Sequence, residues 1–143
     1  MASSFNKFNQ FLEDLAKKKH DLSADVFKVM LTNVAPVATN SIKGDLTEIT
    51  AGNGYTAGGN SAAITSCAQT SGTLKWVLAN PATWTATGGT MATFRYAALY
   101  NDTQITPVKP LIGWYDYGSA VSLAVGEQFQ VAFDGTNGVF TIA

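Results

Sequence analysis

The sequence has few of the residues that catalysis and covalent cross-linking use. Its 143 residues include one cysteine, Cys67, and one histidine, His20. A single cysteine excludes an internal disulfide, and two such residues are too few for a zinc site, which usually needs several Cys or His ligands. A Ser-His-Asp triad has only His20 available, and no Gly-x-Ser-x-Gly motif is present. We therefore expect no catalytic, cofactor-binding or metal site, and no enzymatic activity.

Charge is also scarce. Charged residues make up 13% of the chain, compared with about 25% in an average globular protein. The formal net charge is −1, so the basic excess typical of nucleic-acid-binding proteins is absent, and we expect no direct contact with nucleic acid. The local cluster Lys17, Lys18 and Lys19 falls at the expected end of a helix, where cations complement the helix dipole. Contact with an acidic partner is the alternative for this cluster.

Long apolar runs are absent too. No stretch approaches the roughly 18 consecutive apolar residues of a membrane-spanning helix, and the first residues lack the apolar segment of a signal peptide. We expect a protein that is made in the cytosol and does not enter a membrane. Hydrophobic residues nevertheless make up 46% of the chain, which argues against disorder. The length suits one domain over residues 1–143.

The beginning of the chain predicts a short helix. Ser3 or Ser4 can cap it, and apolar residues recur at steps of three and four. This stripe consists of Phe5, Phe8, Leu12 and Leu15. A helix of about four turns is marginal alone in water. We therefore expect the helix and arm, residues 1–21, to pack on the protein's own core or on another subunit.

From residue 25 to the C-terminus the apolar period becomes two, which indicates a β domain over 25–143. Strands are expected at residues 26–32, 45–50, 63–68, 73–79, 84–86, 92–100, 111–117 and 128–133. The turn at Asp134-Gly135 then predicts a hairpin from the last of these into residues 139–142. Strands and helices do not alternate, so the pattern predicts a mainly β fold. The expected architecture is an antiparallel β-sandwich or jelly-roll-like barrel of about eight short strands with one N-terminal α-helix.

Aromatic side chains and a glycine-rich loop are the remaining candidates for binding. Residues 51–60 lack the Gly-Lys-Ser/Thr ending of a phosphate-binding loop, so we expect a turn that presents Tyr55 as a contact arm. A sugar-binding platform is an alternative for five aromatic residues, Trp76, Trp84, Trp114, Tyr115 and Tyr117. Of these, Trp76 and Trp114 are expected in the core, whereas Trp84 is expected to be partly exposed. Asp116 is expected to point outward from an aromatic strand.

Five stretches together resemble a family of small structural proteins of tailed bacteriophages and prophages. They are residues 5–11 (FNKFNQF), 31–36 (LTNVAP), 52–59 (GNGYTAGG), 94–102 (FRYAALYND) and 111–118 (LIGWYDYG). The resemblance spans nearly the whole chain, and some members of the family look like capsid decoration (cement) proteins. Other related sequences are described as tail or fibre proteins.

The resemblance implies a non-enzymatic virion structural protein, made in the bacterial host cytoplasm and placed on the capsid surface. Its expected partner is the major capsid protein, and it is expected to form a homo-oligomer, a dimer or a trimer. The residues expected at the interface are Phe5, Phe8, Lys17, Lys18, Lys19, Tyr55 and Trp84. The first alternative is a tail or fibre component that contacts host surface glycans. The second is a glycosidase acting on the cell wall through paired carboxylates such as Asp116.

Overall fold

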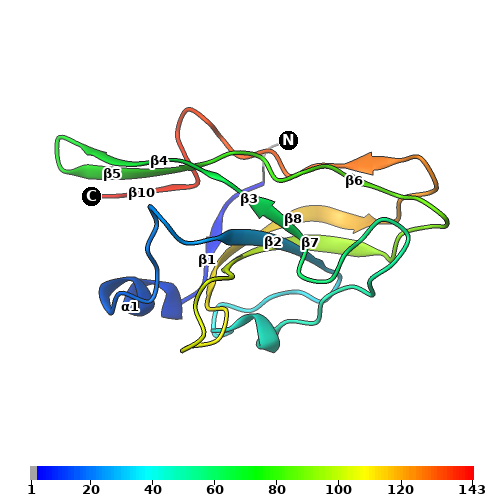
Figure 1. Cartoon of the computed structure of the whole chain (residues 1–143), viewed down its shortest axis with the longest axis horizontal. Coiled ribbons are helices and arrows are strands. Elements are labelled where there is room, and N and C mark those ends of the chain that lie inside the picture. The colour runs from blue at the N-terminus through cyan, green and yellow to red at the C-terminus, as the bar shows by residue number, and fades with distance from the viewer. Residues whose placement is uncertain (1–2) are drawn as a thin grey trace.

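The computed structural model describes residues 3–143 and consists of antiparallel strands with one α-helix (Figure 1). In chain order its elements are β1 (Asn6–Lys7), α1 (Gln10–Ala16), β2 (Phe27–Thr32), the 3-10 helix η1 (Lys43–Asp45), β3 (Asn60–Ala62), β4 (Ile64–Thr70), β5 (Thr73–Leu78), β6 (Trp84–Thr85), β7 (Phe94–Asn101), β8 (Leu111–Val121), β9 (Gln128–Phe129) and β10 (Phe140–Ile142). The predicted mainly β class with a sandwich-like arrangement is confirmed, although the sheets do not close into a barrel.

The central layer is a five-stranded sheet in the order β1-β8-β7-β2-β3. Two of its inner strands, β2 and β7, pair in unbroken antiparallel register from Phe27↔Asn101 to Thr32↔Tyr96. The sequence of β2 is nearly continuously apolar, and five of its six residues are buried. A strand of this kind needs cover on both faces, and the structure supplies it.

One face of this sheet is covered by two smaller sheets, β10-β5-β4 and β6-β9 (Figure 1). Between the layers lies the main core, which includes the fully buried rings of Phe27 and Trp76 in an edge-on contact with centroids 4.8 Å apart. The indole nitrogen of Trp76 donates a hydrogen bond of 2.8 Å to the carbonyl of Leu22. The prediction that Trp76 lies in the core is therefore confirmed.

The opposite face carries a second, smaller core. It consists of Phe8, Met30, Ala98, Tyr100 and Leu111, with Leu46 and Trp114 against them. The ring of Phe8 lies 4.6 Å from that of Trp114. Phe8 and Leu46 come from outside the sheet, so the N-terminal segment and the loop before β3 provide the cover on this side.

The N-terminal helix is shorter than the sequence predicts. Residues Asn6–Lys7 form β1 and pair with Trp114 and Gly113 of β8, and the helix begins only at Gln10. The extended backbone packs the partly buried Phe5 against the main core and places Phe8 in the second core, on opposite faces of the sheet. A helix would hold both rings on one stripe, so burial on two faces favours the strand.

Two other predicted elements differ. Residues 45–50 do not form a strand, because η1 and an isolated bridge between Thr32 and Glu48 occupy this region. The turn at Asp134 is present, with its carboxylate accepting two backbone N–H groups from the residues that follow. However, β10 pairs with β5 and not with residues 130–133. The predicted C-terminal hairpin is therefore wrong, because β10 lies beside β5 in the same sheet, where Phe140 pairs with and packs on Trp76.

Candidate functional site

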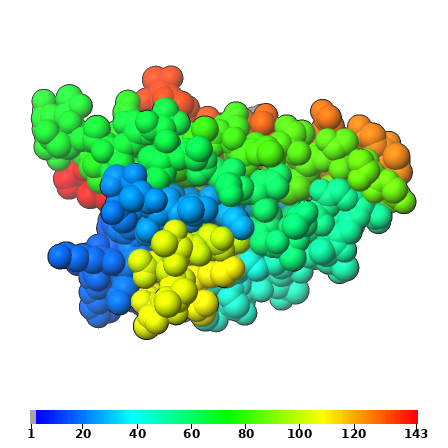
Figure 2. All heavy atoms as spheres, viewed as in Figure 1, coloured from blue at the N-terminus to red at the C-terminus, as the bar shows by residue number. Residues whose placement is uncertain are grey.

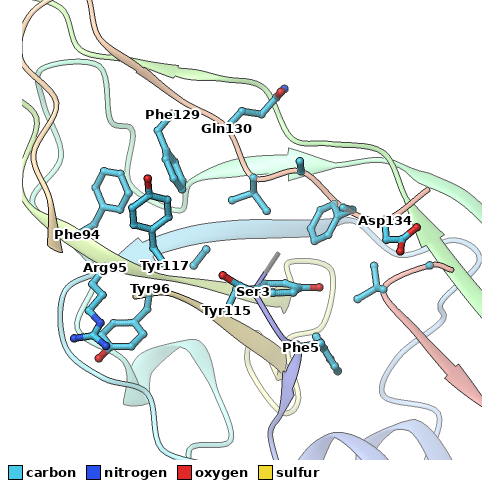
Figure 3. Close-up of a pocket in the computed structure, with 16 residues that line it drawn as sticks. Ser3, Phe5, Phe94, Arg95, Tyr96, Tyr115, Tyr117, Phe129, Gln130 and Asp134 are labelled. Carbon is cyan, nitrogen blue, oxygen red and sulfur yellow. The ribbon is translucent and has the colours of Figure 1, made fainter. Parts of the chain in front are cut away.

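An open groove of about 500 Å³ lies between β7, β8 and the segment that runs from β9 to β10 (Figure 3). We call it the aromatic groove. Its aromatic lining consists of Phe5, Phe94, Tyr96, Tyr115, Tyr117, Phe129 and Phe133. Ligand and partner sites are commonly concave and mostly apolar, with a few polar groups that fix orientation, and the groove has this character.

The rings of the groove contact one another along its length. At one end, Phe129 lies 4.8 Å from Phe94 and 5.8 Å from Tyr117, both in edge-on geometry (Figure 3). Further along, Tyr115 lies 5.8 Å from Phe5 and 6.0 Å from Phe133. Tyr117 is 57% exposed, so a large aromatic surface stands open to solvent beside rings that are already packed.

One member of a polar pair, Arg95, is among the residues that line the groove. The guanidinium of Arg95 donates two hydrogen bonds to the carboxylate of Asp116, at 2.8 and 2.9 Å. These bonds from Arg95, together with the N–H of Gly118, hold the pKa of Asp116 below its usual value. The hydroxyl of Ser3 donates to the carbonyl of Asp116 at 2.6 Å. The prediction that Asp116 points outward is confirmed, and its carboxylate is paired.

Strand alternation explains how the sequence builds the groove. Side chains alternate between the two faces of a strand, so Tyr115 and Tyr117 of β8 line the groove while Trp114 reaches the second core. Across the groove, the alternating residues Phe129, Val131 and Phe133 provide the facing wall. This wall is not a paired strand beyond Phe129.

Three residues expected at an interface are buried within the protein. Phe8 is 0% exposed, Tyr55 is 3% exposed and Trp84 is 1% exposed. Trp84 packs on Phe129 at 6.1 Å under the β6-β9 pair, which corrects the expectation of a partly exposed ring. These three side chains support the fold and do not form an accessible contact surface.

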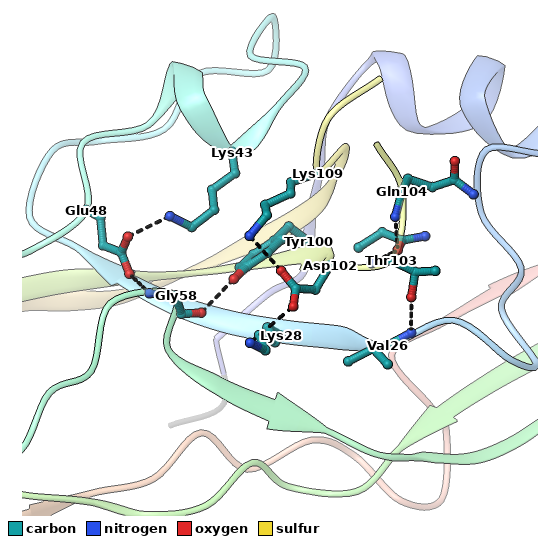
Figure 4. Close-up of polar contacts among 11 residues, drawn as sticks. Val26, Lys28, Lys43, Glu48, Gly58, Tyr100, Asp102, Thr103, Gln104 and Lys109 are labelled. Atoms are coloured by element: carbon teal, nitrogen blue, oxygen red, sulfur yellow. Dashed lines mark hydrogen bonds and ion pairs between the residues drawn. The ribbon is translucent and has the colours of Figure 1, made fainter. Parts of the chain in front are cut away.

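Tyr55 is buried because its loop is tied to the central sheet. Its hydroxyl donates to the carboxylate of Glu48 at 2.6 Å and accepts a hydrogen bond of 3.1 Å from the N–H of Leu31. Glu48 also forms an ion pair of 2.6 Å with Lys43 and accepts a hydrogen bond from the N–H of Gly58 (Figure 4). The glycine-rich loop is thus ordered by polar contacts and is not a free contact arm.

The other expected interface residues lie apart from these. Lys17 and Lys18 are exposed and Lys19 is partly exposed, at the end of α1. Lys17 forms an ion pair with Glu13 one helical turn away. Phe5 alone of the expected set lines the aromatic groove. The structure therefore does not gather the seven residues into one surface.

The groove residues were only partly recognisable from the sequence. Tyr115 and Tyr117 belong to the aromatic set considered for sugar binding, and the structure places them side by side with Phe5 and Phe129. Phe129 and Phe133 carried an alternating pattern that signalled burial, but not the open cavity between them and β8. Among residues 3–143, no cluster of His, Cys, Asp and Glu is arranged to hold a metal ion. None of the helices in the same range is long and apolar enough to cross a membrane.

Comparisons with protein-family models, curated proteins and solved structures gave no match to this chain. We therefore base the function on the surface of the protein and on the sequence stretches quoted above.

Proposed function

We propose that the chain is a structural protein of a tailed-phage particle, a capsid decoration protein that binds the major capsid protein through the aromatic groove. The sequence resemblance supports the assignment to the virion. The observation that carries the role of the groove is the exposed ring of Tyr117 beside Phe94 and Phe129, in a cavity of about 500 Å³. Protein interfaces are anchored by a few aromatic or arginine side chains in pockets.

The groove suits an extended segment of a partner that inserts an apolar side chain between the rings. Tyr117 contributes exposed ring surface, and Arg95 contributes a charged residue to the lining. Clamping of this kind at many copies of the capsid lattice would link neighbouring subunits and resist the pressure of packaged DNA. No covalent chemistry is required of the groove.

The test is binding to expanded capsid shells of the cognate phage that lack their decoration layer. The wild-type protein is expected to sediment with the shells, and Tyr117→Ala is expected to weaken that binding by more than tenfold, or about 1.4 kcal/mol. Ile105→Ala is the matched control, since Ile105 is 83% exposed and lies outside the groove. Absence of shell binding combined with binding to tails would remove the capsid assignment. Equal binding by Tyr117→Ala and wild type would remove the groove as the contact surface.

A tail or fibre component that contacts host glycans is the second candidate. The observation that favours it is the same exposed Tyr117 ring, with the polar residues Arg95, Gln130 and Asp134 also among those that line the groove. An aromatic face stacks on the apolar face of a sugar, while polar groups at the rim receive its hydroxyls. Binding on a glycan array that is lost in Tyr117→Ala would support this candidate, and an array without signal would exclude it. Trp84 is unsuitable for this test because it is buried.

A carboxylate glycosidase is less consistent with the site. A general acid of this class needs a raised pKa, whereas the two hydrogen bonds from Arg95 lower the pKa of Asp116. Peptidoglycan turnover that disappears in Asp116→Asn would revive this reading.

A further inference from the structure

Strand β4 is an edge strand with an unusual composition. It is the outer strand of the β10-β5-β4 sheet, and its seven residues, ITSCAQT, contain no charged residue and no proline. Edge strands present unpaired backbone N–H and C=O groups, and natural proteins usually protect them with lysine, proline, bulges or short length. The one irregularity of β4 lies at its start, between Ile64 and Ser66. From Ser66 to Thr70 the strand is regular and has none of these protections.

The turn of the β4–β5 hairpin shows which backbone groups are free. Thr70 and Thr73 close a two-residue turn in which Ser71 and Gly72 both have positive φ, 50° and 83°. This is the geometry of a type I′ hairpin. Hydrogen-bonded and non-hydrogen-bonded pairs alternate in an antiparallel ladder. Because the closing pair is hydrogen-bonded, every second residue before it in β4 also bonds to β5. These residues are Ala68 and Ser66.

The intervening residues Gln69 and Cys67 therefore direct their N–H and C=O groups away from β5. Within residues 3–143, these four groups have no backbone partner outside the β4–β5 ladder. The side chain of Gln69 folds back on the turn, accepting a hydrogen bond of 3.0 Å from the N–H of Gly72. It consequently leaves the edge uncovered.

The other sheet edges are less suited to pairing. β1 has two residues and β3 and β10 have three each. β8 runs beyond its contact with β1, but that stretch contains the charged Asp116 and Gly118 with a φ of 100°. The β4–β5 hairpin, by contrast, reaches the end of the molecule that lies at the upper left in Figures 1 and 2, beyond the central sheet. Asp21, Leu22 and Ser23 lie beside Cys67 and Leu74 of this hairpin, so a second molecule would approach along the outer edge of β4.

We infer that β4 is a self-association edge, where two copies of this chain pair their β4 strands antiparallel about a two-fold axis. An antiparallel edge is self-complementary under two-fold symmetry, as an isologous interface requires. The absence of charge in β4 removes the like-charge repulsion that opposes such pairing. The four free backbone groups of each copy then find partners in the other, and the two three-stranded sheets become one of six strands. This inference does not rest on the proposed function, because the edge lies apart from the aromatic groove.

The test is the oligomeric state of the full chain by sedimentation velocity over a wide concentration range, with hydrogen exchange of backbone amides. The wild type is expected to dimerise as concentration rises, with the amides of Cys67 and Gln69 becoming protected in step. Gln69→Pro removes an outward N–H without touching the β5 ladder and is expected to give a monomer. Because proline can disturb the hairpin, the second variant is the double substitution Thr65→Lys with Gln69→Lys. It places like charges along the edge and is expected to weaken dimerisation by about tenfold or more.

Ser119→Lys is the control, since Ser119 is exposed on β8 and the substitution adds a lysine away from the edge. It is expected to dimerise like the wild type. A wild type that stays monomeric at every concentration overturns the inference. So does a dimer that survives both edge variants. If the protein never dimerises but the edge variants lose binding to capsid shells, the edge belongs to a different partner. That result would also overturn the inference.

Discussion

The hydroxyl of Tyr55 joins two parts of the chain by donating to the carboxylate of Glu48 at 2.6 Å while accepting from the N–H of Leu31 at 3.1 Å. Tyr55 belongs to the glycine-rich loop, and Leu31 belongs to the central strand β2. The pair lies at the boundary of the core, where Tyr55 is 3% exposed. An unpaired polar group here would lose its solvation without compensation. This hydroxyl is therefore one of the contacts that attach the loop to the sheet.

Tyr55→Phe is expected to lower the free energy of unfolding by about 1–3 kcal/mol, because it leaves the Leu31 N–H without its partner and removes one of the two hydrogen bonds to Glu48 Oε1. Urea denaturation measures this difference. Tyr117→Phe is the control, since its exposed hydroxyl forms no hydrogen bond among residues 3–143, and it is expected to unfold like the wild type. A Tyr55→Phe protein as stable as the control would show that water replaces the hydroxyl.

Gly59 makes a second contact that holds this loop against β2. Its φ is +74°, and a Cβ atom at this position would lie 1.8 Å from the carbonyl oxygen of Val29. Gly59→Ala therefore requires a shift of the β2 backbone, and we expect a loss above about 4 kcal/mol, in the range that single substitutions rarely reach. Gly72 has a similar φ of +83° with nothing within 4 Å of the Cβ position. Gly72→Ala is expected to lose only about 1–2 kcal/mol of left-handed strain.

Thermal and urea unfolding of the two alanine variants separate steric overlap from backbone strain. Similar losses of unfolding free energy in both variants would mean that the positive φ alone determines the destabilisation. The overlap with Val29 would then be relieved without a free-energy cost.

The fold class was recoverable from the sequence because its signals are local. Short apolar runs and alternating apolar residues marked β2, β5, β7 and β8, and the structure confirms them within one or two residues for most boundaries. Trp76 was correctly placed in the core. Which strands pair with one another could not be predicted, because pairing is decided by contacts between residues that are far apart in the sequence. Residues 139–142 had a strong local hairpin signal, yet pair with β5 more than sixty residues away.

The groove illustrates the same limit. Alternation of Tyr115 and Tyr117 indicates one face of a strand, but an exposed ring and a buried ring have the same local pattern. Trp84 and Tyr117 were each flanked by residues without strong apolar character, and Trp84 is buried whereas Tyr117 is open. Phe129 contacts both rings, so the difference comes from the rest of their surroundings, and these depend on how the chain returns over the sheet.

Trp84 and Tyr117 therefore make a direct comparison of core and surface aromatics. Trp84→Ala is expected to lower the free energy of unfolding by about 3–5 kcal/mol through the cavity that it leaves. Tyr117→Ala is expected to change it by no more than about 0.5 kcal/mol. The indole nitrogen of Trp84 is buried and has no hydrogen-bond partner among residues 3–143, so Trp84→Phe is expected to lose less than Trp84→Ala. Denaturant midpoints measure all three. Equal losses at the two positions would contradict the burial of Trp84.

His20 gives the fold a dependence on pH. The imidazole is 5% exposed, packs 5.2 Å from the ring of Phe11 and lies 3.3 Å from the side-chain nitrogen of Asn101. Burial lowers the pKa of His20 to about 4, against an opposing effect of the nearby carboxylates Asp14 and Asp25. Its unfolded value is about 6.5, so at pH values between these two the unfolded chain binds a proton that the folded protein does not.

The stabilising effect of a neutral His20 is therefore fully present above pH 6.5 and declines as the pH falls toward 4. A shift of this size corresponds to about 3 kcal/mol. His20→Gln removes the titration while keeping a polar side chain, and carboxylates that titrate in the same range affect both proteins alike. We expect the wild type to lose about 3 kcal/mol of unfolding free energy relative to His20→Gln between pH 7 and pH 4. Urea denaturation at a series of pH values measures this, and stability curves that stay parallel would show that His20 titrates normally in the folded protein.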